Sequence, residues 1–133
     1  MEFSILTKHF LDLKILFVED EKYTNKMMTK TIRYFCKNID SSLDCNEAIK
    51  MIQSNKYDII ITDLIFPKSN GIDFIERIRK RDKNIPIFVY TGIQDDEIFQ
   101  KCLELNVLDI FIKPMDIEPM FNRIIEKTTQ LKM

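Results

Sequence analysis

The chain is poor in the residues that mark several common classes of protein. It has no tryptophan, two glycines and four prolines among 133 residues, which excludes a collagen-like or linker-rich chain. No apolar run approaches the roughly 20 residues that span a bilayer, and the start lacks a signal-peptide cleavage pattern. A net charge of -1 gives no bulk attraction to nucleic acid or to an anionic membrane. We therefore expect a cytoplasmic protein without direct nucleic-acid or membrane binding.

Cysteine is also scarce, and its pattern is not that of a covalent framework. Cys36, Cys45 and Cys102 are odd in number and form no CxxC pair. We expect reduced thiols rather than disulfides or a zinc site. Hydrophobic residues make up 45% and charged residues 31% of the chain, which is ordinary for one globular domain of this length.

What the sequence does contain is an alternation of short apolar runs with helical patterns. This alternation predicts an α/β fold, with a parallel sheet covered by helices on both faces. The expected strands are Lys14–Val18, Asn38–Ser42, Asp58–Thr62, Ile85–Tyr90 and Asp109–Ile112.

Apolar residues at helical spacing fill the gaps between these strands and predict five helices. The second opens with Asp44 and Glu47, which match a capping box. The fourth opens with acidic residues 95–97, which suit a positive helix N-terminus. The apolar stripes are Met27, Met28, Thr31, Ile32 and Phe35; Ala48, Ile49 and Ile52; Phe74, Ile75 and Ile78; Ile98, Phe99, Cys102 and Leu103; and Met120, Phe121, Ile124 and Ile125.

Residues 1–12 stand outside the alternation. Apolar residues at spacings of three and four begin at Phe3 and end at Leu13, which indicates a short amphipathic helix that packs on the domain or connects it to a partner. His9 has no other ligand type beside it, so we expect no metal there. The domain itself is expected over residues 13–130, with a tail at 131–133.

Polar groups follow four of the expected strands. Glu19 and Asp20 follow the first, Asp63 the third, Thr91 the fourth and Lys113 the fifth. Each alone has an ordinary interpretation, as a helix-end carboxylate, a cap or a surface charge. In an open parallel sheet, however, the carboxyl ends of the strands meet at one edge, where ligands bind. The four strand ends together predict a common site.

The chemistry of this predicted site follows from its groups. Clustered carboxylates repel one another, which raises their pKa values or demands a cation. Mg²⁺ takes oxygen ligands and commonly couples carboxylates to phosphate. A hydroxyl and an ammonium group beside it can bind phosphoryl oxygens, and an aspartate can accept a phosphoryl group covalently. The site therefore suits phosphoryl transfer, with an aspartate carboxylate as the covalent acceptor.

Five segments of the chain, taken in order, resemble the receiver domain of response regulators in two-component signal transduction, over about residues 13–130. The resemblance implies a doubly wound, five-stranded parallel sheet in the flavodoxin-like order 2-1-3-4-5. The matching segments are Lys14–Glu21, Tyr57–Asp63, Phe66–Pro67 with Gly71, Val89–Gly92 and Phe111–Pro114.

By position, the resemblance implies that Asp63 is the phosphoacceptor, that Thr91 and Lys113 respond to the phosphoryl group, and that the Lys113–Pro114 peptide bond is cis. It implies Mg²⁺ as the cofactor, with Mn²⁺ as an alternative. The implied metal ligands are Glu19, Asp20, Asp63 and the backbone carbonyl of Ile65.

Three isoleucines depart from the family pattern. Ile110 stands where the family often has an aromatic switch residue, so readout by a rotating ring is not expected here. Ile65 and Ile93 occupy positions that influence the attack of water on the acyl phosphate. Because both are apolar and β-branched, we predict a long-lived phosphorylated state.

The expected role is a phosphoacceptor signalling domain and not a classical enzyme, with at most self-phosphorylation and slow self-dephosphorylation. The resemblance implies that a sensor histidine kinase or a histidine phosphotransfer protein supplies the phosphoryl group. The output face would be the fourth expected helix, the strand Asp109–Ile112 and the last helix, with a phosphorylation-linked dimer left open. Ile98, Phe99, Ile110 and Met120 are candidate contacts there.

Three alternatives compete with this interpretation. A degenerate receiver would act as a phosphorylation-independent interaction module, although every acidic, Thr and Lys position is filled. A phosphohydrolase of the aspartyl-phosphate kind usually has a second Asp two residues after the nucleophile, where this chain has Ile65. A flavodoxin-like cofactor binder would want a phosphate-cradling first loop, and the carboxylates of residues 19–21 would repel phosphate.

Overall fold

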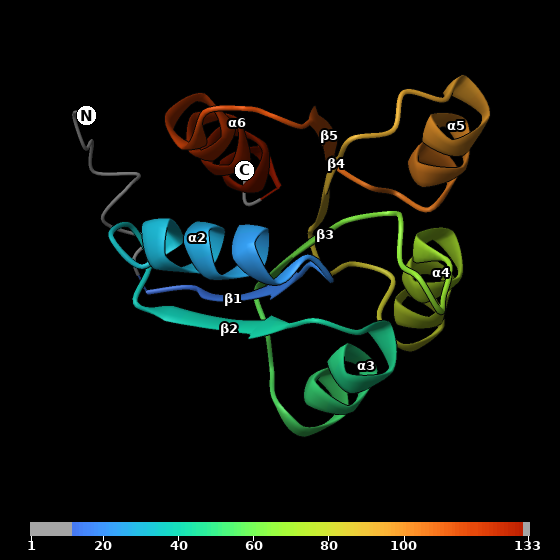
Figure 1. The fold of residues 1–133 in the computed structure, drawn as a ribbon, viewed down its shortest axis with the longest axis horizontal. Helices are drawn as coiled ribbons and strands as arrows, with labels where there is room; N and C mark the ends of the chain where they lie inside the picture. The colour runs from blue at the N-terminus through green and yellow to red at the C-terminus, as the bar shows by residue number, and fades with distance from the viewer. Residues whose placement is uncertain (1–11, 132–133) are drawn as a thin grey trace.

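A five-stranded sheet runs through the computed structural model, which describes residues 12–131 (Figure 1). Neighbouring strands are parallel and lie in the order β2-β1-β3-β4-β5. The predicted doubly wound α/β fold and its 2-1-3-4-5 strand order are therefore confirmed. The strands are β1 (Lys14–Val18), β2 (Asn38–Ser42), β3 (Ile59–Thr62), β4 (Ile87–Thr91) and β5 (Asp109–Ile112).

Five helices of the described chain cover the two faces of the sheet (Figure 1). Two of them, α2 (Lys22–Ile32) and α6 (Ile117–Gln130), pack on one face. The other three pack on the opposite face. Because both faces are covered, the central strands β1, β3 and β4 are largely apolar on both sides. The core divides into one cluster on each side of the sheet. The three helices are α3 (Cys45–Ser54), α4 (Gly71–Arg81) and α5 (Asp96–Glu104).

Three strands have the predicted bounds, while β3 and β4 begin later than predicted. Asp58 is exposed and its carboxylate accepts a hydrogen bond from the backbone N–H of Lys14, so it ends a loop instead of entering the sheet. Pro86 has no N–H to donate to a ladder, and β4 accordingly begins at Ile87. At its other end β4 extends one residue further than predicted, to Thr91.

The predicted apolar faces of the helices include two residues that are in fact exposed. Met27 is 46% exposed and Leu103 is 57% exposed, because the inward faces of their helices are centred on other residues. In α2 that face includes Asn25, Met28 and Ile32. The N-terminus of α3 also differs from the capping box, since Asp44 accepts a hydrogen bond from the N–H of Asn46.

Residues 1–11 fall outside the described part of the chain, so the predicted amphipathic helix and His9 lie there too. Within residues 12–131, no helix has the length and apolar character needed to cross a bilayer. Cys36, Cys45 and Cys102 are buried free thiols, as expected. Helix α6 ends at Gln130, next to the predicted tail at 131–133.

Candidate functional site

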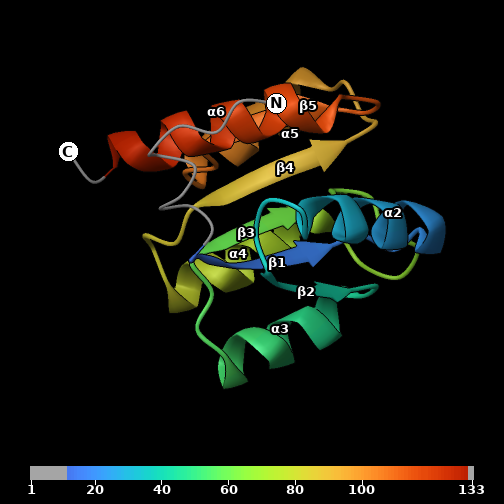
Figure 2. The same ribbon diagram turned by 90° about the vertical axis from the view of Figure 1, so that its left-hand side faces the viewer.

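The parallel sheet brings the polar strand ends to one edge of the molecule. In Figure 2 the arrowheads of β1, β3 and β4 point the same way. Register pairs Val18 with Thr62 and Thr62 with Val89, so the residues that follow these strands emerge side by side. Glu19 follows β1, Asp63 follows β3 and Thr91 ends β4.

Three carboxylates converge at this edge. Glu19, Asp20 and Asp63 each present an oxygen, and these oxygens all lie within 4.8 Å of one another. Glu19 and Asp63 are buried, at 1% and 7% exposure, while Asp20 is half-buried. Burial of like charges at this spacing is unfavourable unless cations compensate it. The cluster therefore has the composition of a cation site.

Lys113 supplies one such cation from the end of β5. Its Nζ lies 2.8 Å from Oδ2 of Asp63 and also donates a hydrogen bond to Oε1 of Glu19. Burial alone acts to lower the pKa of Lys113, but its hydrogen bonds to the two carboxylates outweigh burial and the pKa is raised. Lys113 therefore bridges the ends of β1 and β3 as an ammonium ion.

The carboxylate of Asp63 is held in a fixed orientation. Its Oδ1 accepts hydrogen bonds from the backbone N–H groups of Leu64, at 2.6 Å, and Ile65, at 3.4 Å. Its Oδ2 faces Lys113. One oxygen is thus engaged by the backbone of its own loop, while the other is paired to a side chain that can change partners.

Glu19 is the most deeply buried of the three acids. Burial raises its pKa, and the opposing hydrogen bond from Lys113 does not cancel this effect. Its backbone N–H donates to the carbonyl of Ser42, which ties the end of β1 to the end of β2. A buried carboxylate of this kind is stabilised by any cation that enters the cluster.

Thr91 and the segment after β5 complete the edge. The Thr91 side chain is fully buried, and its hydroxyl oxygen accepts a hydrogen bond, at 3.3 Å, from the N–H of Ile93. The N–H of Lys113 donates to the carbonyl of Thr91 at 2.8 Å. The Lys113–Pro114 peptide bond is cis, as the family resemblance implied. Thr91 and Lys113 are thus coupled through the backbone.

Two residues that support this site were missed in the sequence. Asn25 is buried in α2, and its amide donates to the carbonyls of Glu19 and Ser42 at 2.9 and 3.0 Å. The Tyr90 ring lies under Lys113, with Nζ 5.4 Å from the ring centroid. The position of Asn25 three residues before Met28, on the same helix face, was a weak signal for it; nothing local to Tyr90 marks its position.

The donor set fits a hard divalent cation. Carboxylate oxygens that converge at this spacing are typical ligands of Mg²⁺, which commonly retains several water ligands. Glu19, Asp20 and Asp63 supply these oxygens. Ile65, whose carbonyl was the fourth expected ligand, lies in the loop between β3 and α4 and forms an isolated bridge with Asn70.

This fold and this acidic edge define a doubly wound α/β domain with a candidate cation site. A family model described as the response regulator receiver domain matches residues 15–125. The chain therefore belongs to the response regulator receiver domain family, whose members serve two-component systems and are not classical enzymes.

Two response regulators of known name are similar to this chain in sequence. The chain is 30% identical over 112 residues to the transcriptional regulatory protein CusR of Escherichia coli strain K12, with 84% of this chain and 49% of CusR covered. It is 31% identical over 111 residues to the response regulator ArlR of Staphylococcus aureus, with 84% of this chain and 50% of ArlR covered. The chain thus spans about half the length of these relatives.

The fold is also similar to solved receiver structures. A two-component response regulator from Clostridium difficile is 27% identical, with a TM-score of 0.83, and the match covers 92% of this chain and 100% of that chain. The non-phosphorylated HemR receiver domain from Leptospira biflexa is 23% identical, with a TM-score of 0.80 and coverage of 87% and 94%; at this identity it supports the fold alone.

Proposed function

We propose that this chain is a phosphorylation-controlled switch in which Asp63 accepts a phosphoryl group in a Mg²⁺-dependent reaction. The observation that carries the proposal is the convergence of Glu19, Asp20 and Asp63 within 4.8 Å, with Lys113 paired to Asp63. This is the arrangement that an acyl-phosphate acceptor needs, because it holds the nucleophile and neutralises the charge that arrives with the phosphoryl group.

The proposed donor is a phosphohistidine of a sensor histidine kinase or of a histidine phosphotransfer protein. A carboxylate oxygen of Asp63 attacks phosphorus, the phosphorus–nitrogen bond breaks, and the imidazole leaves with the electron pair of that bond. Mg²⁺, held by Glu19, Asp20, Asp63 and the Ile65 carbonyl, would neutralise phosphoryl oxygens during this transfer. Mn²⁺ has the same ligand preference and is the alternative ion.

Thr91 and Lys113 are the proposed responders. The phosphoryl group adds negative charge and strong acceptor oxygens, so Lys113 exchanges carboxylate partners for phosphoryl oxygens and the Thr91 hydroxyl turns towards them. Because both residues lie at the ends of β4 and β5, the response alters the face formed by α5, β5 and α6.

On that face, half-buried apolar residues are available for a partner. Ile98, Phe99 and Ile110 are half-buried, whereas Met120 is fully buried and belongs to the core, contrary to the contact role expected for it. The E. coli relative is named a transcriptional regulatory protein, which makes control of transcription, through a DNA-binding domain or partner, the first output to examine. A phosphorylation-linked dimer on this face is part of the same proposal.

A measurement of intact mass distinguishes the proposed phosphorylation switch from a phosphorylation-independent interaction module. Protein treated with acetyl phosphate and Mg²⁺ should gain one phosphoryl group. Asp63→Asn should gain none, and neither should wild type treated with EDTA. If wild type and Asp63→Asn behave alike, the assignment of Asp63 is wrong, and an unmodified wild type that also ignores beryllofluoride would favour the interaction module.

The lifetime of the phosphorylated state is a separate proposal. Ile65 is 55% exposed and Ile93 is half-buried. Because both side chains are apolar and offer no hydrogen-bonding group, neither can orient a water molecule for attack on the acyl phosphate. We expect Ile65→Asn to accelerate phosphate loss by about tenfold, since a polar side chain can position the attacking water. Loss measured by intact mass within minutes in the wild type would contradict the proposal.

A further inference from the structure

A groove lies between α3 and α4, away from the acidic edge. Its first part encloses about 420 Å³, and a second cavity of about 370 Å³ continues from it as far as Ile85, just before β4 begins. The groove therefore lies towards the edge of the sheet opposite Asp63. The first part is lined by Ile49, Ile52, Gln53, Arg77, Ile78, Lys80 and Arg81.

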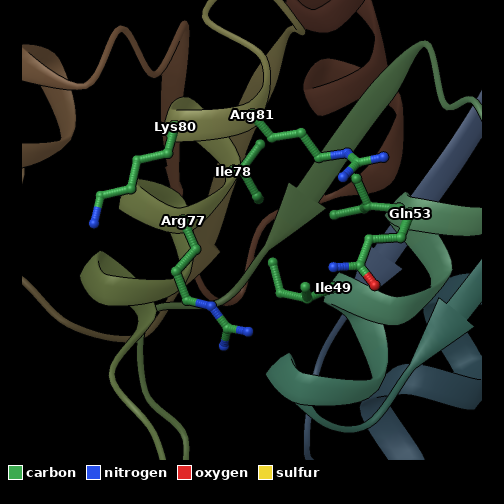
Figure 3. Close-up of a pocket in the computed structure, with 7 residues that line it drawn as sticks. Ile49, Gln53, Arg77, Ile78, Lys80 and Arg81 are labelled. Atoms are coloured by element: carbon green, nitrogen blue, oxygen red, sulfur yellow. The ribbon is translucent and has the colours of Figure 1, made fainter.

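The groove combines an apolar floor with a cationic rim. In Figure 3, Ile49 and Ile78 lie between the side chains of Arg77 and Arg81. Ile49 and Ile52 are half-buried, so part of each side chain is open to a ligand. The first part of the groove has three cationic residues in its lining and no acidic residue. This surface is complementary to a ligand that is both apolar and anionic.

The rim charges have no anionic partners within the described chain. Residues 77–83 contain five of the 20 lysines and arginines, so the positive charge is concentrated at the end of α4 in a chain of net charge -1. Among residues 12–131, no ion pair involves Arg77, Lys80 or Arg81. Arg77 donates one hydrogen bond, to the side-chain oxygen of Asn46 at 3.1 Å.

Helix electrostatics account for only part of this pattern. Cations in the last turn of a helix interact favourably with its C-terminal dipole, and Arg79 is turned inwards, where it donates to backbone carbonyls. Neither effect explains why the outward-facing cations border an open apolar floor. A ligand that neutralises them explains both features.

We propose that this groove binds an acidic segment of a partner protein, with an apolar side chain placed against Ile49, Ile52 and Ile78. Carboxylates beside that side chain pair with the rim cations, because guanidinium groups bind carboxylates through two parallel hydrogen bonds. A nucleic acid would be expected to stack bases on aromatic rings. No aromatic residue lines the first part of the groove, and Tyr57, which lines the second part, is buried. This proposal is independent of phosphorylation at Asp63.

The probe is a fluorescein-labelled peptide, about ten residues long, that alternates leucine with pairs of glutamates. Binding is measured by fluorescence anisotropy, and its position by the amide shifts of the protein. We expect the shifts to map to α3 and α4. Peptides in which the leucines are replaced by serine, or the glutamates by lysine, should bind at least about tenfold more weakly.

The matched variants reverse two charges on opposite faces of the protein. Lys80→Glu with Arg81→Glu should weaken peptide binding by about tenfold or more, whereas Lys26→Glu with Lys30→Glu, on the exposed side of α2, should not. If the first pair fails to fold, Arg81→Gln and Ile49→Ser supply the same comparison. Unchanged affinity in the rim variants, shifts that map elsewhere, or tighter binding of a single-stranded oligonucleotide would each overturn the proposal.

Discussion

Two cations lie at opposite edges of the sheet and have opposite kinds of partner. Lys113, at the carboxyl edge, pairs with the side-chain carboxylates of Glu19 and Asp63. Arg79 is 9% exposed and lies near the other edge. Its guanidinium donates only to backbone carbonyls in the described structure, at distances from 2.6 to 3.2 Å; the acceptors are Leu105, Asp82, Ile85 and Asn106.

The electrostatic consequences differ accordingly. Burial lowers the pKa of Arg79, and the opposing charge of Asp82 does not reverse this direction. At Lys113 burial also acts to lower the pKa, but the two carboxylates reverse the direction. Backbone carbonyls cannot leave Arg79 without unfolding the turns that carry them, so that cation is structural. In the proposed function the carboxylates at Lys113 exchange this partner for a metal ion, and Asp63 accepts a phosphoryl group, so Lys113 is expected to be exchangeable.

The largest expected effect comes from removing the structural cation. Arg79→Met should lower the free energy of unfolding by about 3 kcal/mol, because several carbonyls lose a charged donor while buried. Arg81→Met is the matched control on the exposed surface of the same helix, with an expected change within about 0.5 kcal/mol. Urea unfolding followed by circular dichroism measures both. Equal midpoints for the two variants would show that Arg79 does not clamp this edge.

A smaller effect is expected at Gly71, which connects the acidic edge to α4. A Cβ at this residue would lie 2.4 Å from the Cα of Leu64 and 2.6 Å from its carbonyl oxygen, and the N–H of Leu64 holds Asp63. Gly71→Ala should therefore lower stability by about 2 kcal/mol through the forced backbone shift, and should also slow phosphorylation by acetyl phosphate.

Gly92 is the matched control for this substitution. It follows Thr91 at the same edge of the sheet, but a Cβ there meets no atom within 4 Å. Gly92→Ala should change stability by no more than about 0.5 kcal/mol. Similar losses in the two alanine variants, measured by urea unfolding, would contradict the close approach of Gly71 to Leu64.

The contrast between the two edges also decides what the sequence could predict. Glu19, Asp20, Asp63, Thr91 and Lys113 each follow or end a recognisable strand, so their convergence follows from parallel topology alone. Arg79 lies four residues after Ile75 and therefore on the inward stripe, yet it stands in a run of exposed cations. Two of its four acceptors, Leu105 and Asn106, lie 26 and 27 residues away in the sequence, and no local pattern specifies them.

The residues that support the site were harder to predict from the sequence than the residues that form it. Asn25 is fixed by two carbonyls, one on Glu19 after β1 and one on Ser42 at the end of β2, so its role depends on tertiary contacts. The start of β3 was equally hidden, since it depends on a hydrogen bond between Asp58 and Lys14. Only Pro86 carried a local signal, because proline cannot donate to a ladder.

The smallest expected effect tests whether Lys113 is exchangeable. Lys113→Met keeps the length of the side chain but removes the charge that neutralises Glu19 and Asp63, so a divalent cation should bind the remaining carboxylates more tightly. We expect the dissociation constant for Mg²⁺, measured by calorimetry, to fall by about tenfold, equivalent to about 1.4 kcal/mol. Lys30→Met, exposed on α2, should leave it unchanged. Weaker Mg²⁺ binding in Lys113→Met would mean that Lys113 organises the carboxylates and does not compete for them.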